Sequence, residues 1–361
     1  MNSVFSEQEY EQLVLNTRRM LREYSDIRGI KRVRFETKNL LNCLYGNERY
    51  KINRYSWKTA LMANALSDAG EYNEIKRYIR KWKHIKYQLC EIDDVQNGLL
   101  LLKLYRQNGE YKELMDKLCE FCLNKSRDSQ DSIPYRSNTE DIYVDYLGMV
   151  CPFLFAYAKE FNDTEVHRLA FKQIENFIKY ARDEKTGLVY HGYNYKENTT
   201  KGELGWGRGM GWVLMGIAES IEYIDKTSDE YRLLKEYLRV LANAVINYQR
   251  NDGYFTWSIA DKEAHIDTSA TSMIIYALCK GVEQGVLDAS FIVNIELGAE
   301  ALHRSYKDGK IYDGSGECGG FGKYSKDYGV YPWVMGTSIA LINSIKKIQK
   351  TESGNGKRQI L

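Results

Sequence analysis

The stretch Ile142–Leu154, IYVDYLGMVCPFL, is apolar on nearly every side of a helix and contains a single carboxylate, Asp145. A helix that is apolar all round is buried, so this stretch predicts an interior helix of a helical protein. Apolar surroundings raise the pKa of a carboxylic acid, and a protonated acid in a pocket is what general acid catalysis requires. Asp145 is therefore a candidate catalytic acid. The alternative is that it caps a helix, a position that Asp favours.

Similar apolar stretches recur along the chain, and charged amphipathic ones lie between them. The apolar, small-residue-rich set comprises 57–66, 94–105, 145–158, 208–218, 267–278 and 333–342. The amphipathic set comprises 6–24, 71–88, 110–124, 163–182, 228–249 and 287–305. An amphipathic helix covers a buried one, and a pattern repeated at a long, regular period is typical of a repeat architecture. The sequence predicts an all-α fold, an (α/α)6 toroid or barrel with six inner and six outer helices.

The connections between these helices predict the remaining architecture. Three glycine turns, in 183–190, 251–255 and 307–311, each follow an outer helix and precede a β-prone run, which predicts short β-hairpins at one end of the toroid. Residues 38–55 have a mixed pattern and are expected to form a loop. We expect a single catalytic domain over residues 1–350 and a disordered polar tail over 351–361.

Composition excludes several classes of function. The 361 residues include 51 Lys and Arg against 49 Asp and Glu, so no basic field exists to bind nucleic acid or an anionic membrane. No apolar run is long enough to span a membrane, and the N-terminus lacks the apolar core of a signal peptide. The seven cysteines lie mostly in apolar runs, which predicts reduced thiols in a cytoplasmic protein. Cys119 and Cys122 form a CxxC without a second pair or a well-placed histidine, so a zinc or redox site is not expected.

The predicted topology gathers candidate site residues at one place. All inner helices run in the same direction, so their N-termini meet at one mouth of the toroid, where several carboxylates, an arginine, a histidine and indoles converge. These are Trp57, Asp93, Asp94, Asp145, Arg208, Trp212, Asp267, Thr268, Ser269 and Trp333, with the loop residues His191, Tyr193, Trp206 and Trp257. Such a set suits a carbohydrate site, and helix N-termini there favour an acidic sugar.

Each candidate also has a structural alternative. Asp93, Asp145 and Asp267 could be N-caps, His191 could be a structural histidine, and at least one of the indoles is expected to be core packing. Asp93 and Asp94 have no further ligand at helical spacing, so no metal is predicted. The run GWGRGMGW at 205–212 suggests close approach of a ligand to the backbone around Arg208, but it lacks the features of a phosphate loop.

Five motifs, in this order along the chain, together resemble glycoside hydrolase families 88 and 105, the unsaturated glucuronyl and rhamnogalacturonyl hydrolases, most closely family 105. They are IDDVQNG at 92–98, YVDYLGMVCPFL at 143–154, TGLVYH at 186–191, WGRGMGW at 206–212 and DTSATSM at 267–273. The resemblance runs from about Trp57 to Leu341. It implies an (α/α)6 barrel, neither metal nor organic cofactor, Asp145 as general acid/base and Asp93 as supporting carboxylate.

The resemblance also implies a substrate. It places His191, Arg208 and Trp212 around a 4,5-unsaturated uronic acid, the end left by a polysaccharide lyase, and Trp57, Trp206 and Trp333 are further substrate-binding candidates from their place at the mouth. The implied reaction is protonation of the double bond at C4, followed by attack of water at C5. One departure is that the family often has a histidine about 11 residues before the catalytic Asp, where this chain has IPYR at 133–136. The substrate contacts of that histidine are therefore not carried over.

Two other functions fit the same residues. Asp93 and Asp145 could be the acid and base of an ordinary inverting glycosidase with a water between them. The protein could also bind uronyl oligosaccharides without turning them over. As an enzyme it is expected to act in the cytoplasm on the ends of imported oligosaccharides during polysaccharide degradation, as a monomer or homodimer with no nucleic-acid or membrane partner.

Overall fold

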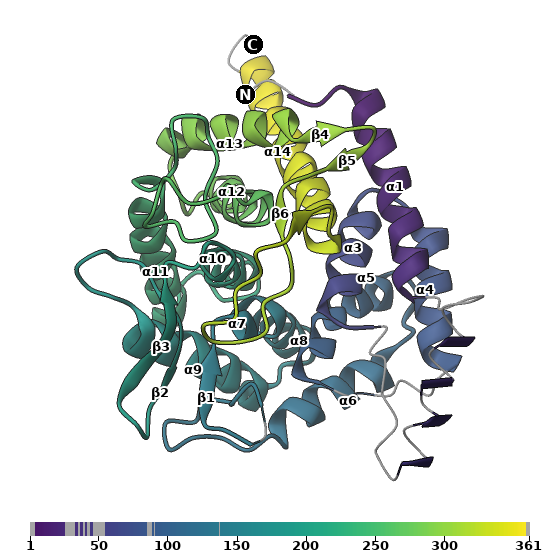
Figure 1. Ribbon diagram of the computed structural model, residues 1–361, viewed down its shortest axis with the longest axis vertical. Helices are drawn as coiled ribbons and strands as arrows, with labels where there is room; N and C mark the ends of the chain where they lie inside the picture. The colour runs from purple at the N-terminus through teal and green to yellow at the C-terminus, as the bar shows by residue number, and fades with distance from the viewer. Residues whose placement is uncertain are drawn as a thin grey trace.

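Six inner helical segments form a closed ring in the computed structural model, which describes residues 4–25, 33–34, 37–38, 40–41, 44–45, 55–84, 89, 91–136 and 138–358. Each segment packs against the next, and the last returns to the first (Figure 1). In chain order they are α3 (Trp57–Asp68), η1 (Ile92–Asn97) with α5 (Gly98–Asn108), α7 (Asp145–Met149) with α8 (Cys151–Phe161), α10 (Gly207–Ile221), α12 (Thr268–Glu283) and α14 (Pro332–Arg358).

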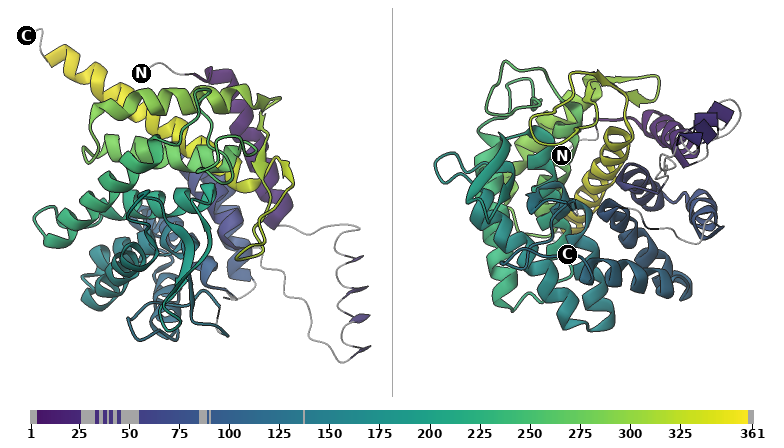
Figure 2. Two further views of the ribbon diagram at one scale, coloured as in Figure 1. Left: turned by 60° about the vertical axis from the view of Figure 1, so that its left-hand side comes forward. Right: turned by 60° about the horizontal axis from the view of Figure 1, so that its bottom comes forward.

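Six outer helices cover this ring. They are α1 (Glu7–Ser25), α4 (Tyr72–His84), α6 (Lys112–Leu123), α9 (Thr164–Ala181), α11 (Asp229–Ile246) and α13 (Ile292–Arg304), which the short η2 (Ala289–Phe291) precedes. Each packs on the inner segment beside it in sequence, except that α1 packs on both α3 and α14 and so bridges the two ends of the ring, as the views of Figure 2 show. The predicted toroid of six inner and six outer helices is confirmed.

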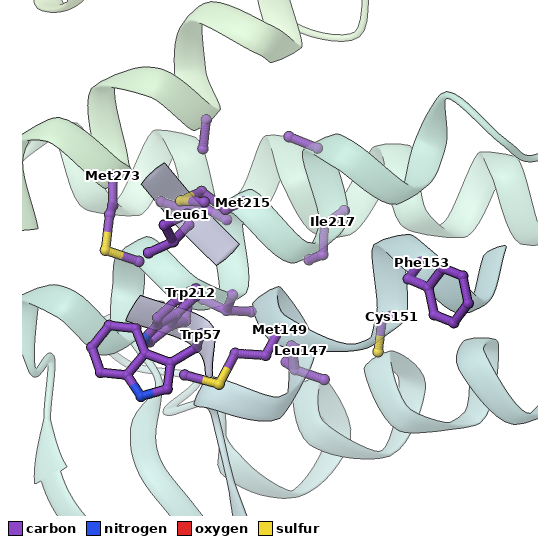
Figure 3. Close-up of a cluster of buried hydrophobic side chains, with 14 of the residues drawn as sticks. Trp57, Leu61, Leu147, Met149, Cys151, Phe153, Trp212, Met215, Ile217 and Met273 are labelled. Carbon is purple, nitrogen blue, oxygen red and sulfur yellow. The ribbon is translucent and has the colours of Figure 1, made fainter. Parts of the chain in front are cut away.

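Small residues on the inner helices allow close packing between them. A Cβ at Gly148 of α7 would lie 2.4 Å from Cε3 of Trp212 on α10, and one at Gly216 would lie 2.6 Å from the Leu147 carbonyl group. The core that results is dense and apolar, with Trp57, Trp212, Met149 and their neighbours in mutual contact in the close-up of Figure 3. These glycines explain why the apolar stretches of the sequence are also rich in small residues.

The stretch 145–158 was expected to be one helix, and this expectation is wrong. It divides at Val150, whose φ of −121° and ψ of −48° are not helical, into α7 and α8. Pro152 lies in the first turn of α8, where its missing N–H costs nothing, whereas inside a continuous helix the proline would remove a hydrogen bond and clash with the preceding turn. Asp145 therefore starts a helix of a single short turn at the mouth.

The three predicted glycine turns are present, and each turns through a residue in the left-handed region, where glycine is favoured: Gly187, Gly253 and Gly309 have φ values of 73°, 84° and 72°. The third joins β4 (Tyr306–Lys307) to β5 (Lys310–Ile311). At the first glycine turn, a single antiparallel bridge pairs Arg182 with Val189. The predicted loop 38–55 lies mostly outside the described residues.

Two further sheets were not predicted. An antiparallel sheet of β1 (Asp141–Tyr143), β2 (Tyr190–Asn194) and β3 (Thr199–Leu204) stands at the mouth, with Tyr143 opposite Gly192. A shorter pair joins β6 (Gly314–Ser315) to β7 (Tyr328–Gly329). Because β1 leads directly into α7, its pairing with β2 fixes where Asp145 begins its helix.

The chain's end and its cysteines complete the description. Helix α14 continues to Arg358, and residues 359–361 lie outside the described part, so the domain boundary at 350 stays a prediction. Cys119 and Cys122 on α6 are buried free thiols, and burial raises the pKa of Cys122 to about 12. Such thiols are poor metal ligands and nucleophiles, because both roles require the thiolate. No helix in the described ranges combines the length and apolarity needed to cross a bilayer.

Candidate active site

The N-termini of the inner segments meet at one mouth of the toroid, as the topology predicts. The Trp57 ring at the start of α3 lies 5.8 Å from that of Trp212 on α10 and 4.9 Å from that of Trp333 on α14. Arg208 at the start of α10 reaches Ser269 at the start of α12, with Nη1 3.5 Å from Oγ. Residues from four inner helices thus contact one another in one small region.

Asp145 and His191 form the central polar contact of this region. His191 lies on β2, and its carbonyl oxygen accepts the Val144 N–H at 2.9 Å, which brings the two side chains together. Nε2 of His191 is 3.3 Å from Oδ2 of Asp145. Asp145 does not have the capping role considered for it, since Val144 is the N-cap of α7.

The Asp145 carboxylate is not sealed among apolar groups, contrary to the expectation from its neighbours in sequence. Tyr146 and Leu147 turn into the core, whereas the Asp145 side chain remains 15% exposed beside His191. Successive residues of a helix point about 100° apart, so a polar residue within an apolar run can face a different way from its neighbours. Asp145 points to the mouth, where a ligand can reach it.

Asp93 is the more deeply buried acid of the two. It lies in η1 with 7% of its surface exposed, and its Oδ1 has no hydrogen-bond partner among the described residues. Burial, followed by the charges of Asp94 and Glu91, raises the pKa of Asp93 to about 7. Asp93 is not an N-cap either, because Glu91 caps η1 in a reciprocal pair with Asp94. Asp93 is therefore the deeply buried acid, whereas the sequence suggested that Asp145 would be.

Tyr135 lies close to both carboxylates and was not identified from the sequence as a site residue. After burial, the charges of Asp93 and then Asp145 are the strongest influences that raise the pKa of the Tyr135 phenol. Its ring packs 5.2 Å from that of Tyr143. Tyr135 lies in the IPYR segment, where the resembling family often has a histidine. That correspondence was the signal in the sequence that could have identified Tyr135.

Arg208 contacts the protein's own chain. The side chain is buried, and Nη1 donates to the carbonyl and hydroxyl oxygens of Ser315 at 3.0 and 2.8 Å, while Nη2 donates to the Gly316 carbonyl at 3.0 Å. Asp267 holds the same strand, because its Oδ2 accepts the Ser315 hydroxyl at 2.7 Å. Asp267 is also the N-cap of α12, accepting the Ser269 N–H at 2.8 Å, so the capping alternative is correct for this residue. Together Arg208 and Asp267 anchor β6 to the mouth.

Four of the predicted indoles pack at this end of the toroid. Trp57, Trp206, Trp212 and Trp333 are all buried, and Trp212 is fully so. Trp333 donates its Nε1–H to the Ser315 carbonyl at 3.1 Å, whereas Nε1 of Trp212 has no partner among the described residues. The expectation that at least one indole is core packing is confirmed by Trp212.

Three other candidates from the sequence take supporting positions. The partly buried Trp257 ring lies 5.5 Å from that of Tyr324. Thr268 donates its hydroxyl to the Tyr312 carbonyl at 2.6 Å. Tyr193 points away from the site, with its hydroxyl 2.8 Å from that of Ser132.

Residues 316–327, which we call the covering segment, extend from β6 to β7 across the mouth in front of α7 (Figure 1). Glu317 pairs with Lys58 of α3 at 2.6 Å, and Phe321 stacks on Tyr143 with ring centroids 4.0 Å apart. Tyr324 reaches Nδ1 of His191 at 3.0 Å. Sequence reasoning missed this segment, although its composition, CGGFGKY at 318–324, with glycines between aromatic residues, was a usable signal.

No group of three or more His, Cys, Asp or Glu side chains in the described part of the chain is arranged to hold a metal ion. The mouth instead offers two carboxyl groups in different environments, a histidine in contact with one of them, and aromatic walls. Such an arrangement can transfer a proton to a bound molecule and activate a water.

Comparisons with known proteins agree with the geometry. The family model described as Glycosyl Hydrolase Family 88 matches residues 50–346. An unsaturated rhamnogalacturonyl hydrolase, YesR of Bacillus subtilis, is 22% identical over 240 residues, which cover 62% of this chain and 70% of YesR. An unsaturated 3S-rhamnoglycuronyl hydrolase of Formosa agariphila is 27% identical over 159 residues, covering 40% of this chain and 41% of that protein.

Solved structures share the fold. A possible member of family GH105 from Klebsiella pneumoniae superposes with a TM-score of 0.81 at 16% identity, covering 94% of this chain and 93% of that one. An unsaturated glucuronyl hydrolase specific for heparin superposes with a TM-score of 0.71 at 16% identity, covering 96% and 99%. The toroid is thus common to this chain and to these proteins.

Proposed function

The chain belongs to glycosyl hydrolase family 88 and is a glycosidase, and from this premise we propose that it removes a terminal 4,5-unsaturated uronic acid from oligosaccharides that a lyase has generated. The names of the two relatives, an unsaturated rhamnogalacturonyl and an unsaturated 3S-rhamnoglycuronyl hydrolase, support an unsaturated uronyl substrate. The observation that carries the proposal is the pairing of an accessible carboxyl group, Asp145, with His191 at the mouth of the toroid.

In the first step Asp145 acts as an acid. Its proton is transferred to C4 of the unsaturated sugar, the electrons of the C4–C5 double bond form the new C4–H bond, and the positive charge that develops at C5 is shared with the ring oxygen. The His191 N–H next to Oδ2 stabilises the carboxylate that this transfer leaves behind. Partial exposure of the side chain allows the sugar to reach it.

In the second step Asp145 acts as a base. The carboxylate accepts a proton from a water molecule whose oxygen attacks C5, and this restores the acid. The product is a hemiketal; its ring opens at the bond between C5 and the ring oxygen, and C1 becomes a hemiacetal that releases the neighbouring sugar as an alcohol. One water is consumed in total, and no other reactant is required.

Asp93 supports this cycle from a buried position. A pKa of about 7 means that its carboxyl group is about half protonated at neutral pH, whereas an ordinary Asp is ionised. A neutral Asp93 adds no second negative charge to this end of the toroid while Asp145 is a carboxylate. In the proposed cycle Asp145 transfers the protons and Asp93 supports it, and these roles differ because the environments of the two acids differ.

The surroundings of the site support action at a chain end. The covering segment contacts both sides of the mouth, through Lys58 and through Tyr143, which favours entry of a terminal residue over the middle of a polymer. Free cysteine thiols are consistent with a reducing compartment, and we propose cytoplasmic action on imported oligosaccharides late in polysaccharide degradation.

One observation favours a second candidate function. A carboxyl group with a pKa of about 7 and a separate accessible carboxylate are also what an inverting glycosidase needs, with Asp93 as acid and Asp145 as base. The test is a panel of disaccharides, each in unsaturated and saturated form. Loss of the ultraviolet absorbance of the unsaturated sugars, without turnover of the saturated ones, supports the hydration reaction; the reverse pattern supports the inverting glycosidase. Unsaturated galacturonyl and glucuronyl members of the panel also identify the sugar.

A further inference from the structure

Tyr324 connects the covering segment to the floor of the site. Its ring lies beside those of His191, Trp206 and Trp257, with centroids 5.5, 5.6 and 5.5 Å away. Its hydroxyl oxygen is 2.7 Å from the backbone nitrogen of Glu203 on β3 and 3.0 Å from Nδ1 of His191. A residue more than 130 positions from His191 in the chain therefore makes the hydrogen bond on the side of the imidazole that faces away from Asp145.

The directions of these hydrogen bonds follow from the atoms involved. A backbone N–H can only donate, so the Tyr324 oxygen accepts from Glu203. The phenol keeps its own proton to donate, and Nδ1 of His191 lies at hydrogen-bond distance to receive it, 3.0 Å away. Nδ1 is then unprotonated, and the ring proton of neutral His191 is on Nε2, facing Oδ2 of Asp145.

We propose that Tyr324 is a positioning residue, which holds His191 as the Nε2–H tautomer and thereby determines which oxygen of Asp145 carries the catalytic proton. This rests on the proposed function. Because the Nε2–H donates to Oδ2, that oxygen is an acceptor in both protonation states of Asp145. The proton of the neutral acid is therefore on Oδ1, the oxygen that His191 leaves to the substrate.

The reaction then uses one oxygen of Asp145 for both proton transfers. Oδ1 gives its proton to C4, Oδ2 keeps the His191 hydrogen bond while the carboxylate is charged, and Oδ1 receives the proton of the attacking water. His191 does not gain or lose a proton at any step. Without the hydrogen bond from Tyr324, the ring proton of His191 can move to Nδ1, and an unprotonated Nε2 would then compete with the substrate for the proton of Asp145.

The test is the substitution Tyr324→Phe, which keeps the ring and its packing and removes only the hydroxyl group. We expect kcat on an unsaturated uronyl disaccharide to fall roughly tenfold to a hundredfold, as for a small misplacement of a catalytic group, with KM within about twofold. In the protein without substrate, ¹⁵N NMR of the imidazole rings should show His191 protonated on Nε2 in the natural protein and as a mixture of tautomers in the variant. With five histidines in the chain, the His191 signals can be assigned by substitution of the other four in turn.

A matched control removes a phenol hydroxyl elsewhere. Tyr10→Phe on the outer helix α1 deletes a 2.6 Å hydrogen bond to Asn343 and should change neither kcat nor the His191 signals. A proton on Nδ1 of His191 in the natural protein overturns the proposal, and so does a loss of kcat in Tyr324→Phe with an unchanged tautomer, since that is a structural effect alone. If the natural protein does not turn over unsaturated uronyl sugars, the proposed function fails, and the NMR measurement still decides how Tyr324 holds His191.

Discussion

Replacement of Asp93 by Asn should stabilise the protein more as the pH rises. The folded-state pKa of about 7 lies above the ordinary value of 3.8, so the folded protein holds this proton more tightly than the unfolded chain. Below pH 3.8 Asp93 is protonated in both the folded and the unfolded protein, so its raised pKa does not change the free energy of unfolding. Between 3.8 and 7 the unfolded chain ionises first, and stability falls with pH until both states are ionised. Asn, which is neutral and nearly the same shape, removes this dependence.

The magnitude follows from the two pKa values. At 1.36 kcal/mol per pKa unit, the raised pKa of Asp93 lowers the free energy of unfolding by about 1.7 kcal/mol at pH 5 and by about 4 kcal/mol at pH 8. The advantage of Asp93→Asn over the natural protein should therefore grow by about 2.5 kcal/mol between these pH values. For a chain of 361 residues, with an unfolding entropy of about 2 cal/mol/K per residue, the difference in melting temperature grows by about 3 °C.

The assay is thermal unfolding of both proteins at pH 5 and pH 8, in matched ionic strength. Any effect of the amide that does not depend on pH cancels in the comparison. Asp229→Asn is the control, because the Asp229 side chain is 90% exposed and its ion pair with Arg232 lies at the surface. A melting-temperature difference for Asp93→Asn that stays the same at the two pH values would refute the assignment of a raised pKa to this buried acid.

Three other substitutions test separate parts of the account. Asp145→Asn should lower kcat by roughly a hundredfold to ten-thousandfold with little change in melting temperature, and near-normal turnover would remove Asp145 from its role. Arg208→Ala should cost about 2–4 kcal/mol in urea unfolding, because the Ser315 hydroxyl and the Gly316 carbonyl lose a donor and the Ser315 carbonyl keeps the Trp333 N–H alone of the two side-chain donors described. The exposed Arg232→Ala should cost little, and equal values for the two would show that Arg208 does not anchor β6. Gly148→Ala should cost roughly 1–3 kcal/mol, because its Cβ would overlap Trp212, and an unchanged stability would mean that α7 and α10 are less tightly packed than the structure has them.

The arrangement of helices could be predicted because it depends on local patterns. Inner helices are apolar on all sides and outer helices on one, and this contrast alone gives the number and order of both sets. The break at Val150 was the exception, although Pro152 was visible in the sequence. A proline in the first turn of a second helix and a proline that kinks one helix have the same local sequence, so the division depends on how α7 and α8 pack.

The site could be predicted only in part. Helix direction was enough to bring Trp57, Asp145, Arg208 and Trp333 to one mouth, but the burial of each side chain depends on neighbours far away in the chain. The Asp145 stretch looks more apolar than that of Asp93, yet Asp93 is the more deeply buried residue. For the same reason no local pattern could show that Tyr324 contacts His191, or that Arg208 is engaged by Ser315.

The most direct test of the proposed hydration is the fate of C4 when the reaction is run in D₂O. If Asp145 delivers a solvent-derived proton to the double bond, early-time NMR of the product should show one deuterium at C4, on a single face of that carbon, appearing at the rate at which the absorbance disappears. A product that is first released with its double bond intact, or that carries deuterium equally on both faces from the outset, would contradict the account, because C4 would then have been protonated in solution and not by the enzyme.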